Sequence, residues 1–289
     1  MRDRAAQLLE NGTVQQVLAW QAGEIETYPQ PAFFTTVQSL DSMVYNQFCS
    51  TNLSKYMIDA AHTKTLVFLR PCDTYSYNQL LAENQIKREH AYIIGIGCNG
   101  CALVKDGDDK GLLERCQVCT KTQHMVYDEL LDTNDNQRNT TDAEVRFKHV
   151  HEIEALDESA RFAFWSAQLQ KCIRCNACRN ICPVCHCNTC VFDGEAYDTL
   201  QKANASQAEG QMFHITRALH VAGRCSDCGQ CSMACPQDIP LHLLNRKLIA
   251  DINAMYGNYQ AGQDIYAQAP LSKYDATQDP EPRRGVQDV

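Results

Sequence analysis

The segments CIRCNACRNICP at residues 172–183 and CSDCGQCSMACP at residues 225–236 decide the organisation of this chain. Each segment carries four cysteines with the spacing C-x2-C-x2-C-x3-C followed by proline, and the second copy lies 53 residues after the first. Two-residue gaps let one loop turn three thiolates toward a common centre, whereas the three-residue gap leads the fourth cysteine away. We therefore expect each fourth cysteine to serve the centre of the other copy.

This spacing is the ligand pattern of bacterial ferredoxins with two [4Fe-4S] clusters. It predicts one cluster on Cys172, Cys175, Cys178 and Cys235, and a second on Cys225, Cys228, Cys231 and Cys182. Pro183 and Pro236 fix the backbone just after the exchanged ligands. Structural zinc fits less well because its sites use separated cysteine pairs, and disulfide frameworks belong to short secreted chains.

Length and composition bound the class of protein. The 289 residues suffice for about two domains of roughly 100 to 200 residues each. A net charge of −9 argues against nucleic acid as a partner, and no apolar run is long enough to span a membrane. Because 17 cysteines occur without a secretory leader in residues 1–40, we expect a reducing, cytoplasmic location.

The pattern of apolar residues predicts an α+β protein, in which a small α/β domain precedes a helical, loop-rich dicluster ferredoxin-like domain. Strands are expected at residues 65–70 and 91–97 as a parallel pair, and helices at 2–22, 74–89, 157–170, 211–222 and 241–256. The expected units are an N-terminal helix and α/β domain at 1–150, the cluster domain at 151–260 with an insertion at 183–224, and a polar tail at 261–289.

Nine cysteines lie outside the doubled motif. Cys49 is expected to be a small buried apolar residue. Cys98, Cys101, Cys116 and Cys119 form two C-x2-C pairs separated by 14 residues, a pattern compatible with either zinc or a further iron-sulfur cluster. Candidates for additional ligands are Cys72, Cys185, Cys187 and Cys190.

Gly95, Gly97 and Gly100 spell the G-x-G-x-x-G fingerprint of dinucleotide-binding domains after a predicted strand. That fingerprint should open a helix whose N-terminus holds a pyrophosphate. The following residues, ALVKDGDDKG at 102–111, contain two glycines and three aspartates and form a poor helix. We therefore interpret these glycines as a turn around a metal ligand and do not expect FAD.

The chain resembles a known group of redox subunits over roughly residues 60–250, through RPCD at 70–73, CIRCNACRNICPVCHC at 172–187 and GRCSDCGQCSMACPQDIP at 223–240. It is similar to the iron-sulfur beta subunits of cytoplasmic sulfhydrogenases and the A subunits of anaerobic sulfite reductases. Related chains accompany formate dehydrogenases and heterodisulfide-reductase-type modules. The resemblance implies a relay between a flavin- or nucleotide-binding reductase subunit and a catalytic subunit of hydrogenase or formate dehydrogenase type.

Three classes of function follow from these patterns. No nucleophile-base pair or carboxylate pair stands at a spacing that catalysis would require, so the leading hypothesis is a non-catalytic electron-transfer subunit of an oxidoreductase complex. The alternative is a self-contained flavin- or cluster-dependent reductase of a small substrate. An iron-sulfur sensor or structural module is the third.

Overall fold

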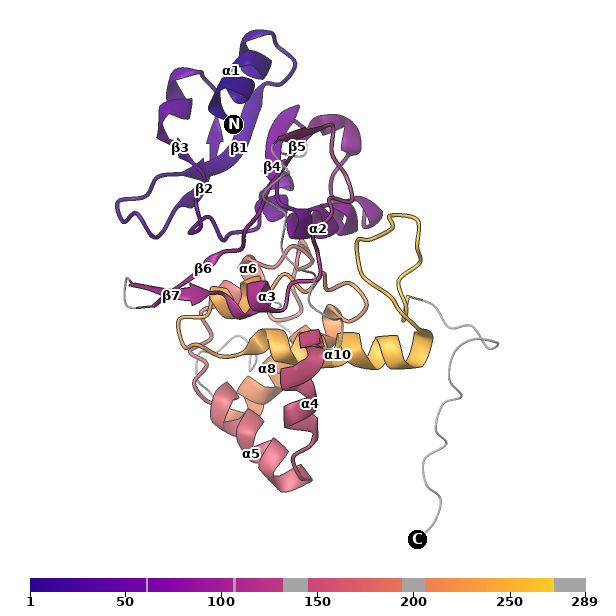
Figure 1. Cartoon of the computed structure of the whole chain (residues 1–289). Helices are drawn as coiled ribbons and strands as arrows, with labels where there is room; N and C mark the ends of the chain where they lie inside the picture. Colours follow the sequence, from indigo (N-terminus) through magenta and orange to yellow (C-terminus); the bar gives the residue numbers. More distant parts are fainter. Residues whose placement is uncertain (61, 106–107, 132–144, 194–205, 273–289) are drawn as a thin grey trace.

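The computed structural model describes residues 1–60, 62–105, 108–131, 145–193 and 206–272. A sheet-based part holds the N-terminal half of the chain, and a helical part holds most of the rest (Figure 1). The predicted α+β class is confirmed. The predicted linker at 132–144, part of the insertion (194–205) and the tail from 273 lie outside the described residues.

The main sheet has the strand order β2-β1-β4-β5-β8, with β3 also paired to β1. Its strands are β1 (Gln16–Gln21), β2 (Gln30–Phe34), β3 (Met43–Val44), β4 (Thr65–Leu69), β5 (Ala91–Ile96) and β8 (Glu129–Leu131). The pairs β1–β4, β4–β5 and β5–β8 are parallel, whereas β2 and β3 run antiparallel to β1. The predicted parallel pair at 65–70 and 91–97 is thereby confirmed.

The central strands are apolar because both of their faces are covered. All five residues of β4, TLVFL, are buried, as expected for a central parallel strand. Helix α2 (Pro71–Ala82) follows directly, with Pro71 in its first turn, where a missing N–H costs nothing. It begins three residues before the predicted helix and ends seven residues sooner.

The predicted helix over residues 2–22 is wrong in its second half. Helix α1 covers Arg2–Glu10, and the chain then enters strand β1. Val17 and Leu18 occur where a helical face would place them, but they lie in a strand that pairs with β4 and is buried on both sides. Pairing within the sheet thus outweighs the local helical pattern.

The connection between β5 and β8 carries a second, small sheet and a short helix. Strands β6 (Ala102–Lys105) and β7 (Asp108–Leu112) form an antiparallel pair, and helix α3 (Glu114–Gln117) follows. In Figure 1 these elements lie at the junction between the sheet and the helical part. The cysteines from 98 to 119 are therefore placed next to the helical part.

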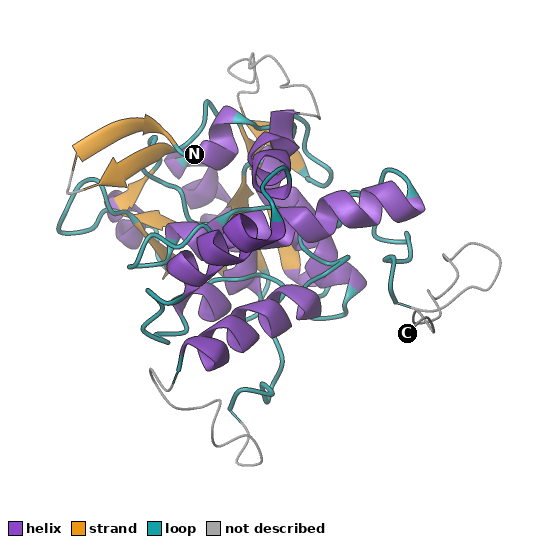
Figure 2. Ribbon diagram, turned by 90° about the horizontal axis from the view of Figure 1, so that it is seen from below, coloured by secondary structure: helices purple, strands orange, loops and turns teal. Residues whose placement is uncertain are grey.

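The helical part contains α4 (Lys148–Glu154), α5 (Glu158–Leu169), α6 (Ala177–Asn180), α8 (Gln207–His220), α9 (Gln230–Met233) and α10 (Leu241–Tyr256). Asp157 caps α5 by accepting a hydrogen bond from the Ala160 N–H, and Ser206 caps α8 in the same way from Glu209. Helix α10 has the predicted bounds. Figure 2 shows these helices crossing one another in front of the strands.

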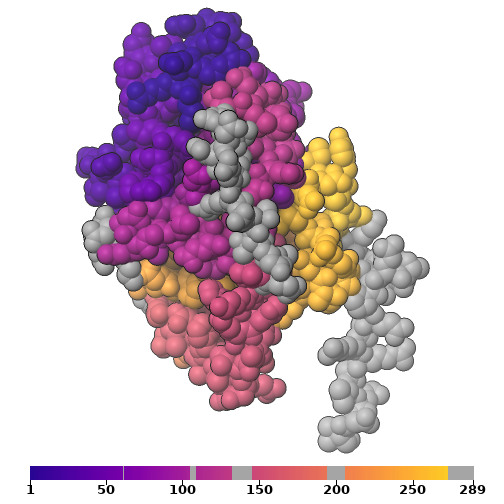
Figure 3. Space-filling view, in the orientation of Figure 1, coloured from indigo at the N-terminus to yellow at the C-terminus, as the bar shows by residue number. Residues whose placement is uncertain are grey.

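The segment after α10, residues 257–272, returns to the sheet-based part and joins the two halves. After α10, Gly262 accepts a hydrogen bond from the Asn78 side chain of α2. Figure 3 shows this segment, in yellow, lying along the side of the molecule. Within the described residues, no helix is both long and apolar enough to cross a membrane.

Candidate metal centres

The two cysteine loops have the same backbone conformation. Arg174 and Asp227, which are equivalent under the 53-residue shift, both take left-handed conformations, with φ of 56° and 55°. Asn176 and Gly229, two residues later, do so as well, with φ of 61° and 66°. These turns fold each loop back on itself, as a loop must when three of its side chains face one centre.

The same turns direct main-chain N–H groups at sulfur. The N–H of Arg174 lies 3.4 Å from Sγ of Cys172, and the N–H of Asp227 lies 3.4 Å from Sγ of Cys225. Such hydrogen bonds stabilise the thiolate form that iron requires. Short helices α6 and α9 then carry the third cysteine of each loop and pack against each other.

The fourth cysteines approach the opposite loops. Burial raises the pKa of the Cys172 and Cys178 thiols, and the neighbouring Cys235 thiol of the second loop raises both further. In the second loop, burial likewise raises the pKa of Cys225, Cys228 and Cys231, and each of these three thiols has Cys182 of the first loop beside it. This arrangement supports the predicted ligand exchange. Thiols that are buried together are largely removed from water, so iron is a more suitable partner for them than water is.

Arg217 of α8 stands between the two sets of thiols. Its guanidinium is buried and donates a 2.9 Å hydrogen bond to the carbonyl of Cys178. Burial alone would lower the pKa of Arg217, but the charges of Cys231, Cys182 and Cys178 raise it above its ordinary value. A buried cation at this place offsets the negative charge that thiolate ligands bring.

A third group of cysteines lies at the junction of the two halves. One pocket is lined by Cys72 at the start of α2, by Cys98 and Cys101 after β5, and by Cys116 and Cys119 from and after α3. The Cys101 thiol has the Cys116 and Cys98 thiols as hydrogen-bonding partners, which lower its pKa below the ordinary value. The structure thus brings together all four cysteines of the two predicted pairs, together with Cys72.

Cations surround this third group. The Arg70 guanidinium donates a 2.8 Å hydrogen bond to Sγ of Cys101 and forms a buried ion pair with Asp73. Arg115 and Lys121 line the same pocket. Opposite charge favours the thiolate form of cysteine, which is the metal-binding form. Arg70 and Asp73 belong to the RPCD segment at 70–73 on which the resemblance rests, whereas no local pattern marks Arg115 and Lys121.

Arg115 and Lys121 also reach the second cysteine loop. Arg115 donates to the carbonyl oxygens of Cys228 and Ser50, and Lys121 donates to the carbonyl of Ser226. Cys72, Cys116 and Cys119 share a pocket with Cys228. The third group and the centre of the second loop are therefore direct neighbours.

The remaining cysteines do not form a group of their own. Cys185 lies beside Cys182, Cys190 packs near Leu169 and Phe213, and Cys187 is exposed. Cys49 is 1% exposed, and the prediction that it is a small buried residue is confirmed. Cys185 thus lies beside a cysteine of the doubled motif, whereas Cys190 packs against residues of α5 and α8.

The expectation that no helix follows the glycines of the G-x-G-x-x-G fingerprint is confirmed. No helix opens after Gly100, because strand β6 begins at Ala102. Gly95 lies in β5, where a Cβ atom would come 2.6 Å from Leu130 and 2.9 Å from His124. Close packing against its neighbours explains this glycine without a phosphate ligand.

A separate network joins the cysteine loops to the sheet-based part. Glu83 at the end of α2 accepts hydrogen bonds from Arg224, which precedes Cys225, at 2.5 and 2.7 Å. His186 and Gln79 also bind this carboxylate. Burial opposes ionisation, but these hydrogen bonds outweigh it and lower the pKa of Glu83 to about 2. No pattern in the sequence marks this link, because Glu83 and Arg224 lie far apart in the chain.

The donor set fits iron-sulfur clusters better than a single ion. Among the described residues, no three His, Cys, Asp or Glu side chains converge on one point in the manner of a mononuclear site. A [4Fe-4S] cluster does not need such convergence, because each thiolate binds a different iron atom at a corner of the cube. The residues that would hold the two clusters are the eight cysteines of the doubled motif.

Comparison with known proteins agrees with this geometry. Residues 168–239 match the model of the 4Fe-4S dicluster domain. The chain is similar to the F420-dependent formate dehydrogenase subunit beta of Methanocaldococcus jannaschii, with 24% identity over 89% of each chain. It is also 24% identical to the F420-dependent formate dehydrogenase 1 subunit beta of Methanococcus maripaludis, over 74% of this chain and 78% of the relative. The chain is an iron-sulfur protein with a 4Fe-4S dicluster domain at residues 168–239.

Proposed function

We propose that this chain is an electron-transfer subunit of an oxidoreductase complex. A [4Fe-4S] cluster, when bound, accepts and releases one electron. The observation that carries the proposal is the arrangement of three neighbouring cysteine groups, in which the second loop stands between the first loop and the third group. Neighbouring centres of this kind suit transfer over a distance better than chemistry at one site.

We propose the doubled-motif ligands as predicted, with Cys235 and Cys182 exchanged between the loops. For the third group we propose a further [4Fe-4S] cluster on Cys98, Cys101, Cys116 and Cys119, with Cys72 as the alternative fourth ligand. Zinc remains the competing occupant. Cys185, Cys187 and Cys190 are left outside these centres, because the eight cysteines of the doubled motif already supply four thiolates to each of the two clusters.

The protein's own residues hold the relay together. Arg217 fixes the carbonyl of Cys178 and lies beside thiols of both loops. Arg115 fixes the carbonyl of Cys228 while its neighbour Cys116 belongs to the third group. Rigid placement of neighbouring centres keeps the separation between them constant, and rates of electron transfer depend steeply on that separation.

The relatives support the same function and indicate the partners. Both are named as beta subunits of formate dehydrogenases, which implies a complex of several subunits. We propose a catalytic subunit of formate dehydrogenase type as the first partner, with a hydrogenase subunit as the alternative indicated by the sulfhydrogenase resemblance. A flavin-bearing reductase subunit is the proposed partner at the other end.

Anaerobic reconstitution of the single chain tests this function. The reconstituted chain should accept electrons from reduced methyl viologen but should not oxidise formate or hydrogen. Adding the catalytic subunit should restore substrate oxidation with this chain as acceptor. Sustained oxidation of formate or hydrogen by the pure chain would contradict the proposal.

One cavity favours a second candidate function, reduction of a small molecule by this chain itself. A hollow of about 520 Å³ is lined by residues of both halves, among them Phe48, Arg115, Gly229 and Met233. It therefore touches residues next to the third group and the second loop. Since the relatives are named as F420-dependent, F420 is the first compound to test. Reduction of F420 by the pure reduced chain, lost in Met233→Trp, would support this candidate.

A further inference from the structure

The three centres differ in how far they reach the protein surface. Of the eight cysteines in the doubled motif, only Cys175 is exposed, whereas Cys178, Cys182 and Cys231 are buried and the others are half-buried. In the third group, Cys101 is buried and the other four cysteines are half-buried. The first loop is therefore the place where a thiolate ligand meets the outside of the described protein.

Two cationic residues flank Ile173 in the loop that carries Cys175, although the whole chain carries a net charge of −9. They are Lys171 and Arg174, whereas Arg161 and Arg179 are paired with Glu154 and Asp193. The second loop itself contains one arginine and two aspartates at residues 224–240, and cations from other segments, among them Arg115, Lys121 and Arg246, lie beside it. In the first loop, by contrast, Lys171 and Arg174 belong to the loop that carries the exposed cysteine.

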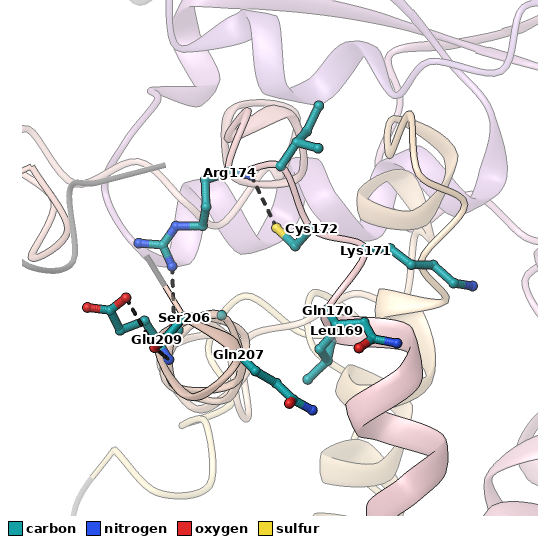
Figure 4. Close-up of a pocket in the computed structure, with 10 residues that line it drawn as sticks. Leu169, Gln170, Lys171, Cys172, Arg174, Ser206, Gln207 and Glu209 are labelled. Atoms are coloured by element: carbon teal, nitrogen blue, oxygen red, sulfur yellow. Dashed lines mark hydrogen bonds between the residues drawn. The ribbon is translucent and has the colours of Figure 1, made fainter. Parts of the chain in front are cut away.

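The same surface carries an apolar residue and a hollow. Ile173, between the ligands Cys172 and Cys175, is 45% exposed. A hollow of about 290 Å³ beside it is lined by the first loop and the start of α8 (Figure 4). Arg174 stacks on Phe213 at 4.0 Å and donates to the Glu209 carbonyl at 3.4 Å, which keeps its charge at the edge of this hollow. The Glu209 carboxylate is bound by Ser206.

We propose that the face formed by Lys171, Ile173, Arg174 and Cys175 is the docking surface for a separate redox protein whose own docking face is acidic. An exposed apolar centre with a charged rim is the usual composition of such transient interfaces. Charge complementarity speeds encounter and fixes orientation. In the docked pair, one electron leaves the donor protein, which is oxidised by one unit, and enters the centre of the first loop, which is reduced by one unit. This inference rests on the proposed relay function and names the place where electrons enter the relay.

Binding and electron transfer with flavodoxin, a small acidic one-electron carrier, test the docking surface. The variants are Lys171→Glu, whose side chain donates a hydrogen bond to the Gln168 side chain, and the matched control Lys87→Glu, which replaces another exposed lysine in the sheet-based part. At low ionic strength, Lys171→Glu should weaken the Kd for oxidised flavodoxin about tenfold and slow electron transfer from reduced flavodoxin by a similar factor. Lys87→Glu should change neither by more than about twofold.

Two further measurements separate docking from other effects. At about 0.5 M salt the difference between wild type and Lys171→Glu should nearly vanish, because surface charges are then screened. Reduced methyl viologen is a cation, so its electron transfer to Lys171→Glu should be as fast as to wild type or faster. Equal loss with both donors would overturn the docking surface, since Lys171→Glu would then act on the cluster itself, and iron content and the electron paramagnetic resonance spectrum would show that damage.

The outcomes distinguish this inference from the proposed function. If no donor reduces the wild-type chain, the relay function itself fails. If wild type accepts electrons but Lys171→Glu binds flavodoxin as tightly as wild type, the docking surface is overturned. A concentration-dependent dimer of wild type that Lys171→Glu abolishes would also overturn it, since the face would then serve a second copy of this chain.

Discussion

Equivalent residues in the two loops carry opposite charges. Arg174 and Asp227 share the left-handed backbone and the hydrogen bond to a cysteine sulfur, yet one is a cation and the other an anion. Burial would raise the pKa of Asp227, but Arg246, Arg146 and Lys121 together lower it below its ordinary value. The repeat therefore preserves the shape of the loop, whereas each copy has its own electrostatic surroundings.

The exchange of ligands gives a prediction for single cysteines. Cys182→Ala should remove the cluster of the second loop and leave the cluster of the first loop in place, because Cys182 lies beside Cys225, Cys228 and Cys231. Iron content should fall by about four atoms, the content of one cluster. Cys235→Ala is the matched control and should remove the other cluster. Electron paramagnetic resonance distinguishes the two, and loss of the first-loop cluster in Cys182→Ala would show that each motif is self-contained.

Glu83 gives a prediction for stability. A pKa lowered from 4.5 to about 2 corresponds to about 3 kcal/mol of folding free energy, so Glu83→Gln should lose a large part of this amount at neutral pH. The stabilisation is fully present above the unfolded pKa near 4.5 and is lost as pH falls toward 2. Anaerobic urea unfolding should therefore show the same difference between variant and wild type at about pH 6 and pH 8.

The control for this measurement is Glu89→Gln. The Glu89 side chain is 70% exposed, so its replacement should change the free energy of unfolding very little. A loss in Glu83→Gln no larger than that in Glu89→Gln would contradict the role assigned to the Glu83–Arg224 link.

Among the elements, those with a strong local pattern were predictable. Helix α10 has the predicted bounds because its apolar residues follow helical spacing along its whole length and Gly257 ends it. The prediction of a helix at 2–22 was wrong in its second half because strand β1 is defined by its pairing with β2 and β4. These partner strands lie outside the short stretch of sequence from which a helix is predicted. The eight motif cysteines were predictable because their spacing is a local pattern. The roles of Arg115, Lys121 and Glu83 were not predictable, because their partners lie far away in the sequence.

The segment after α10 provides a prediction at the scale of an element. Gly262 has φ of 76°, and a Cβ atom there would lie 1.8 Å from the carbonyl oxygen of Tyr75 in α2. Gly262→Ala should therefore displace this segment from α2 and cost about 3 kcal/mol or more. Gly257→Ala is the control, since φ is 83° but nothing lies within 4 Å, and its cost should be about 1 kcal/mol. Urea unfolding and limited proteolysis near residue 262 measure both; equal losses would contradict the close contact.

At the scale of the whole molecule, the third cysteine group lies where the two halves meet. Its cysteines come from α2, from the turn after β5 and from the region of α3, and Arg115 and Lys121 join it to the second loop. If the group holds the proposed metal centre, loss of that centre should loosen the contact between the halves, because metal binding holds together segments that are distant in sequence.

Metal content decides what the third group holds. Two clusters require eight iron atoms per chain, and a third cluster at the junction raises the number to about twelve, with an equal amount of acid-labile sulfide. The double variant Cys98→Ser/Cys116→Ser should lower iron by about four atoms and leave the two ferredoxin-type signals unchanged, because the eight motif cysteines are untouched. Eight iron atoms with about one zinc in the wild type, and loss of that zinc in the double variant, would instead assign the group to zinc. Only four iron atoms in the wild type would contradict the two-cluster core itself. Anaerobic analysis of iron, zinc and sulfide in the wild type and in the double variant therefore distinguishes a third cluster, a zinc site and the failure of the two-cluster core.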